Sequence, residues 1–216
     1  MSWIFFDRLL SRLDPEEQKN TLSHGMGVLL SFLGSGFLLY SHEQTSFVGV
    51  ATLWIYSIAV TLLFAASTIY HANSNHPVRK KIWQKVDHIS IYILIAGTYS
   101  PVTLITLENS SGWGLFYTVW AIALVGAVLK LFFTGKFERL SLLLYVGMGW
   151  LIVYDVHNLL ILLSNDAIGF LIAGGFFYTV GVVFYQWKTL ANHHFIWHLF
   201  VLAGAVSHYF MILNIA

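Results

Sequence analysis

The sequence has no cysteine and little charge. With no cysteine among 216 residues, a disulfide framework, a thiolate metal site and a cysteine nucleophile are all excluded. Only 10% of the residues are charged, against about a quarter in an average soluble domain, which is too few to cover a soluble surface. The net charge of +1 excludes the broad basic field of a nucleic-acid-binding protein. The 57% of hydrophobic residues therefore indicates an integral membrane protein.

Seven apolar runs recur along the chain, each close to the length that crosses a bilayer. They are continuous rather than alternating, which favours helices over the strands of a membrane β-barrel. The sequence thus predicts an all-α, seven-transmembrane helix bundle that forms a single domain over residues 1–216. The predicted spans are Leu22–Tyr40, Phe47–Tyr70, Ile89–Leu107, Trp113–Phe133, Leu140–Leu163, Ile168–Trp187 and Phe195–Ile215.

The basic residues predict the orientation. All 11 lysines and arginines lie before the first span or around the connections that follow the second, fourth and sixth spans. With seven spans these positions share one side, and basic residues accumulate on the cytoplasmic side. We therefore expect a cytoplasmic N-terminus, an external C-terminus and a multi-pass location in a cell membrane. Residues 1–20 are predicted to be cytoplasmic, either as an amphipathic helix on the inner surface or as a docked or disordered segment.

Polar residues gather at one depth of the predicted bundle. An ionisable residue inside a membrane span is costly and is therefore a functional candidate. Ser67 and His71 end the second span, Asp87 precedes the third, and His194 and His198 flank the start of the seventh. On the predicted orientation, all five lie near the cytoplasmic leaflet.

The histidine spacing predicts a metal site. His194 and His198 are one helical turn apart and can bind a single ion. His71 would complete a three-histidine set with one position left for water, which is the pattern of catalytic zinc. Asp87 could then deprotonate that water, and Ser67 could orient it. Imidazole and carboxylate ligands suit Zn²⁺ and also accept other first-row metals.

Three further histidines lie near this predicted site. His24 belongs either to the site or to the headgroup level at the start of the first span. His88 points about 100° away from Asp87 on a helix, which favours a packing or interfacial role. His193 is an alternative ligand to His194, but it has no histidine one turn further along the helix.

The opposite half of the bundle carries fewer polar residues. His208 lies about 15 Å beyond His198 along the helix, which favours a buried structural contact over a place in a proton path. Asp155 and His157 are predicted to be interfacial, with a second polar pocket as the alternative. Pro101 is predicted to kink the third span.

The motifs around these residues resemble the hemolysin III branch of the progestin and adipoQ receptor family. The resemblance extends from about Glu16 to the C-terminus and implies a seven-helix bundle with zinc near the cytoplasmic side. It assigns the ligands to His71, His194 and His198 and the motif serine and aspartate to Ser67 and Asp87. The matching stretches are Glu17–Gly25, Ser67–His71, Asp87–Pro101, Leu144–Trp150, Ala173–Gly181 and His194–Val201.

The resemblance also implies a function. The family is grouped with alkaline ceramidases in a proposed superfamily of membrane metal hydrolases. Its bacterial branch is connected with haemolytic activity and membrane-lipid homeostasis. The absence of the long cytoplasmic extension of the adiponectin receptors favours that bacterial branch.

Four functions follow as hypotheses. The leading one is a zinc-dependent hydrolase that acts on a lipid amide or ester, with membrane lipids as partners and no nucleic acid. The second is a non-enzymatic sensor of lipids or of membrane state, with a structural zinc ion. A pore-forming haemolysin is disfavoured because a conducting pore needs a continuous polar lining. A proton-coupled transporter is a weaker alternative, motivated by His208, Asp155 and His157.

Overall fold

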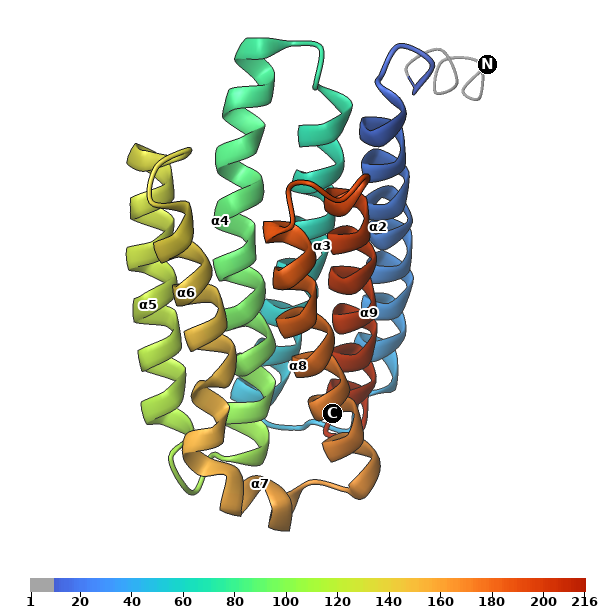
Figure 1. Cartoon of the computed structure of the whole chain (residues 1–216). Helices are drawn as coiled ribbons and strands as arrows, with labels where there is room; N and C mark the ends of the chain where they lie inside the picture. Colours follow the sequence, from blue (N-terminus) through green and yellow to red (C-terminus); the bar gives the residue numbers. More distant parts are fainter. Residues whose placement is uncertain (1–9) are drawn as a thin grey trace.

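The computed structural model describes residues 10–216, and within that range every regular element is helical. Seven spans built from these helices are long and apolar enough to cross a membrane, so the predicted all-α, seven-span fold is confirmed (Figure 1). The elements are α2 (Pro15–Ser41), α3 (Phe47–Ala72), α4 (Pro77–Pro101), the π-helix η1 (Val102–Thr106), α5 (Gly112–Phe133), α6 (Glu138–Trp150), the 3-10 helix η2 (Leu151–Asp155), α7 (Val156–Leu162), α8 (Asn165–Gln186) and α9 (His193–Leu213).

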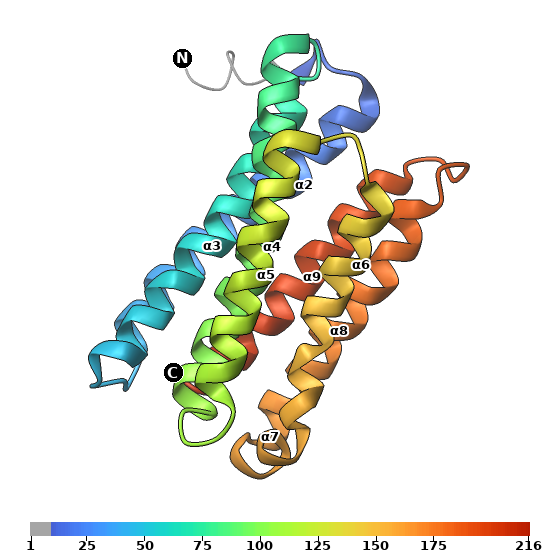
Figure 2. The ribbon, with the colours of Figure 1, turned by 90° about the vertical axis from the view of Figure 1, so that its left-hand side faces the viewer.

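The helices form a bundle with α4 as its most enclosed member. Within the most apolar stretch of the α4–η1 span, 67% of the residues are buried. The corresponding share for α8 is 17%. α2 packs against α3 and α9, α4 packs against α3 and α5, and α6 lies beside α4, α5 and α8 (Figure 2). The basic end of the bundle carries the start of α2 and the α3–α4, α5–α6 and α8–α9 connections (Figure 1). This is the end that the charge distribution predicts to be cytoplasmic.

Two helices begin earlier than the hydrophobic pattern predicts. α4 starts at Pro77 instead of Ile89, and α2 starts at Pro15 instead of Leu22. Proline is favoured in the first helical turn because it needs no hydrogen-bond acceptor there. The basic cluster around Lys80 therefore lies on a helix rather than in a loop, and residues 15–20 belong to α2. The rest of the predicted N-terminal amphipathic segment, up to residue 9, lies outside the described residues.

The predicted fifth span is interrupted rather than continuous. Its α-helix ends at Trp150, and η2 and α7 follow. Tyr99 of α4 inserts its hydroxyl at this point: it donates to the carbonyl of Met148 at 2.7 Å and accepts from the backbone N–H of Ile152 at 2.8 Å. In a continuous α-helix those two backbone groups would bond to each other. An inserted side chain is a recognised cause of such a break.

The helix type of the third span changes after Pro101. The chain continues from α4 into η1, whose closing bond joins the N–H of Leu107 to the carbonyl of Val102 at 3.1 Å. That five-residue separation is the spacing of a π-helix. The sequence predicts a kink at Pro101, and the structure has a π-helical turn directly after this residue.

Candidate metal centre

Three histidines converge at the basic end of the bundle. His71 lies in the last turn of α3, and His194 and His198 lie in the first two turns of α9. One nitrogen from each ring lies within 4.8 Å of the other two. His71 and His198 are buried, and His194 is partly buried. The structure thus brings together the three residues predicted as ligands, close enough for one ion to contact all three.

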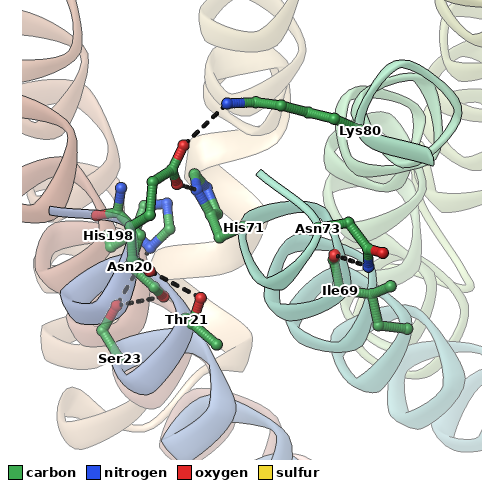
Figure 3. Close-up of polar contacts among 9 residues, drawn as sticks. Asn20, Thr21, Ser23, Ile69, His71, Asn73, Lys80 and His198 are labelled. Atoms are coloured by element: carbon green, nitrogen blue, oxygen red, sulfur yellow. Dashed lines mark hydrogen bonds and ion pairs between the residues drawn. The ribbon is translucent and has the colours of Figure 1, made fainter. Parts of the chain in front are cut away.

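The ring of His71 is fixed by a carboxylate. Its Nδ1 lies 2.5 Å from Oε2 of Glu17, and Nζ of Lys80 donates to Oε1 of the same carboxylate at 3.0 Å (Figure 3). Because a carboxylate only accepts, Nδ1 of a neutral His71 carries the proton and Nε2 keeps its lone pair. Within residues 10–216 this buried Nε2 has no hydrogen-bond partner. A carboxylate, a histidine and a free Nε2 form the arrangement that supports metal-bound histidines.

A hydroxyl orients His198 in a similar way. Ser23 Oγ lies 3.2 Å from His198 Nδ1 and donates its own proton to the carbonyl of Asn20 at 3.0 Å (Figure 3). Since that proton is committed, the hydroxyl accepts from His198 Nδ1–H. Nε2 of His198 is then the unprotonated nitrogen. Both buried histidines therefore have the tautomer that a metal ion requires.

His24 belongs to this site and not to the headgroup level. It is 3% exposed, and its ring stacks on His198 with centroids 3.6 Å apart. Both of its ring nitrogens are buried without a hydrogen-bond partner in the described part of the chain. It lies outside the three-nitrogen cluster, so its contact with His198 is one of packing.

Ser67 and Asp87 lie on the same side as the histidines. Ser67 is buried, one helical turn before His71, and Asp87 is on the adjoining face of α4. The Asp87 carboxylate lies within hydrogen-bonding reach of the Ser67 hydroxyl. Both side chains line a cavity together with His194 and His198. The structure therefore gathers all five residues that the sequence predicts for the site.

The cavity begins at these polar residues and continues through the bundle. Its volume is about 530 Å³, and its walls come mainly from α4, α6, α8 and α9. Beyond the polar end it is lined mostly by aliphatic and aromatic side chains as far as Met211. Two lining residues, Trp150 and Phe176, are 55% and 57% exposed on the outer surface of the bundle. The cavity therefore reaches the lipid-facing surface between α6 and α8.

The remaining polar predictions have mixed outcomes. His88 lines the cavity, and its buried Nδ1 is unpartnered within residues 10–216, so the predicted packing role is incomplete. Asp155 is buried at the outer end of the bundle, where its carboxylate accepts hydrogen bonds from Ser110 and Ser111 of the η1–α5 connection and from Asn158. His157 is exposed. The interfacial placement of both residues stays a prediction.

Sequence reasoning did not find the groups that hold the histidines. The carboxylate of Glu17, the hydroxyl of Ser23 and the ammonium of Lys80 were not predicted to take part in the site. Glu17 and Ser23 lie on α2, while Lys80 lies on the extended start of α4. The available signal was the Glu17–Gly25 motif, which places Glu17 and His24 seven residues apart and hence on one face of a helix.

The chain is similar to known proteins over nearly its whole length. The sequence profile of the family described as Haemolysin-III related matches residues 14–209. "Hemolysin-3" of Bacillus cereus is 38% identical over 205 residues, which cover 94% of this chain and 93% of the relative. "Hemolysin-3 homolog" of Bacillus subtilis (strain 168) is 40% identical over 199 residues, covering 92% and 93%. "Monocyte to macrophage differentiation factor" of Homo sapiens is 27% identical over 205 residues, covering 91% and 83%.

Proposed function

The chain belongs to the Haemolysin-III related family, and on the geometry of its site we propose that it is a zinc-dependent membrane hydrolase that cleaves a lipid amide or ester. Family membership confirms the resemblance carried by the sequence motifs, and the seven apolar helices make the chain a multi-pass membrane protein. The observation that carries the proposal is the convergence of three imidazoles, two of which, His194 and His198, line the polar end of an acyl-sized cavity.

The donor set suits zinc. Three imidazoles without a fourth protein ligand are typical of catalytic rather than structural zinc sites. The unpaired, buried Nε2 of His71 fits this assignment, because burying such a group without a partner is otherwise costly. When bound, zinc lowers the pKa of a water molecule and polarises a carbonyl group.

The protein's own groups supply proton transfer and orientation. Asp87 accepts a proton from the attacking water and returns it to the departing amine or alcohol, so that water is consumed as the C–N or C–O bond breaks. Ser67 donates a hydrogen bond to the carbonyl oxygen as negative charge develops on it. Glu17 and Ser23 hold the tautomers of His71 and His198, and the apolar cavity wall excludes water from the acyl chain.

The proposed activity is tested with purified protein and defined lipids. We expect release of fatty acid from at least one lipid amide or ester class in a panel that includes ceramides, N-acyl amines and glycerolipids. A chelator should abolish the release, and re-added zinc should restore it, because the site supplies its electrophile only when loaded. Mass spectrometry of the extracted products is the measurement. Absence of zinc-dependent release across the whole panel would contradict the proposal.

A second candidate is a non-enzymatic lipid sensor with structural zinc. It is favoured by the origin of the histidines on α3 and α9, two helices that both pack against α2. A metal ion would tie them together directly. In that case chelation would lower the melting temperature of the protein and no lipid would be turned over. A pore is not proposed, because the cavity lining is mostly apolar beyond the histidines.

The carboxylate behind His71 gives a prediction about metal affinity. Glu17→Gln removes the charge that fixes His71 Nδ1–H. We expect zinc binding to weaken by about 10- to 100-fold, the usual cost of losing such a support. Competition against a chelating dye measures this affinity. Glu16→Gln is the matched control, because it alters the neighbouring carboxylate in the same helical turn and should leave the affinity unchanged. Equal affinity in both variants would contradict the supporting role.

A further inference from the structure

His208 places an imidazole in the outer half of the mostly apolar cavity, beside the Tyr178 ring, with the two ring centroids 5.4 Å apart. It lies on α9 ten residues after His198 and lines the same cavity. That separation is about 15 Å along the helix. Leu171, Ile172 and Met211 are among the aliphatic residues that line this part of the cavity. An imidazole in such a wall is costly unless both nitrogens are satisfied.

The structure satisfies one of the two nitrogens. Nε2 of His208 lies 3.4 Å from the backbone carbonyl of Leu171. Gly174 leaves the space for the ring, because a Cβ atom at that position would collide with it. Nδ1 has no hydrogen-bond partner within residues 10–216. The His208 ring therefore contacts α8 through Nε2 and Gly174, whereas its Nδ1 makes no hydrogen bond within the described residues.

The partner of Nε2 determines the chemistry of Nδ1. A carbonyl can only accept, so Nε2 carries the proton of the neutral ring. Nδ1 then has a lone pair and acts as an acceptor. The group that it can bind is a donor such as a hydroxyl, whereas a ketone or an ether offers no proton.

We propose that His208 is a specificity-determining residue that accepts a hydrogen bond from a mid-chain hydroxyl group on the acyl chain in the cavity. This inference rests on the proposed function, since it assumes that the carbonyl end of that chain lies at the three histidines. An extended chain advances about 1.3 Å per carbon–carbon bond, so about 15 Å corresponds to roughly a dozen carbons. The substrate class is then a lipid whose acyl chain is hydroxylated near that position.

The test is direct binding of free fatty acids to the intact purified protein. The probes are octadecanoate and its derivatives with a hydroxyl near the head, at about the twelfth carbon or at the tail, together with the mid-chain ketone. Each competes with a fluorescent fatty acid in detergent. A buried neutral hydrogen bond contributes about a factor of ten. We expect the mid-chain hydroxyl to bind about tenfold more tightly than octadecanoate, and the other derivatives to gain nothing.

Variants separate this role from a structural one. His208→Leu should abolish the preference, so that the mid-chain hydroxyl acid binds no more tightly than octadecanoate, while His208→Gln, which keeps an acceptor, should retain part of it. His157→Leu makes the same substitution at an exposed histidine that does not line the cavity and should retain all of it. A preference that survives in His208→Leu would overturn the proposal. If that variant does not fold, equal binding of all hydroxyl positions by the wild-type protein would overturn it as well.

This binding test does not depend on whether the protein hydrolyses lipids. A mid-chain preference without any hydrolysis would contradict the proposed activity and leave the specificity of the cavity standing. Hydrolysis without a preference for the mid-chain hydroxyl would support the proposed activity and contradict the role of His208. A wild-type protein that binds none of these fatty acids would overturn the inference, because the cavity would then not hold an acyl chain.

Discussion

His198→Ala should yield a purified protein without bound metal. The wild-type chain is expected to bind about one zinc ion, the number that a single three-imidazole site holds. Removing the His198 imidazole leaves only two of the three candidate ligands, His71 on α3 and His194 on α9. The loss of affinity should exceed the 10- to 100-fold effect of losing a supporting group. Elemental mass spectrometry of the purified protein measures the bound metal.

The same experiment includes a second ligand and a matched control. His71→Ala should lose the metal equally, because its Nε2 is the buried nitrogen without a partner in the described residues. His157→Ala removes an exposed histidine of α7 at the other end of the bundle and should retain about one ion per chain. Stoichiometric metal in both ligand variants would show that the three-histidine cluster is not the metal site.

Much of the fold could be predicted because each span carries its own signal. A run of apolar residues such as Phe47–Tyr70 must satisfy its backbone internally in lipid, and only a helix does so within one segment. The observed α3 starts at the same residue, Phe47. The placement of the basic residues predicts which end of the bundle is cytoplasmic, and this prediction needs no knowledge of contacts between helices. Helix starts were less predictable, because the residues that precede Ile89 and Leu22 are mostly polar and continue the helix without an apolar signal.

The histidine cluster could also be predicted from the sequence, for a related reason. His194 and His198 are neighbours through helix geometry alone. His71 could be added because membrane spans reverse direction at each connection, which places the end of the second span at the depth of the start of the seventh. Depth is therefore predictable from topology. Distance within the plane of the membrane is not, and the 4.8 Å grouping of the three nitrogens had to come from packing.

Contacts between helices account for the predictions that failed or were missing. Glu17 precedes the predicted first span, and its contact with His71 depends on how α2 lies against α3. His24 is ambiguous from its position, and its stacking on His198 depends on α2 and α9. The break in the fifth span is caused by Tyr99, a residue of another helix. None of these contacts follows from the periodicity of a single segment.

Asp87→Asn should abolish turnover without removing the metal. The substitution keeps the size and the hydrogen-bonding reach of the side chain, but asparagine cannot take a proton from the attacking water. We expect the rate of lipid hydrolysis to fall by about 10²- to 10⁴-fold, the usual contribution of a positioned proton-transfer group. Zinc content should be unchanged, because Asp87 lies outside the three-nitrogen cluster.

The combination of lost activity and retained metal separates this role from a ligand's role. A variant of a proposed ligand, such as His198→Ala, should lose both the activity and the metal. A variant remote from the site should keep both. Asp166→Asn is the remote control, since its carboxylate is exposed at the start of α8, at the end of the bundle opposite the histidines. If Asp87→Asn hydrolysed lipid at the wild-type rate, proton transfer would have to come from another group. The hydroxyl of Ser67 would not replace it, because a serine does not ionise at neutral pH and in the proposed mechanism only donates a hydrogen bond to the carbonyl oxygen.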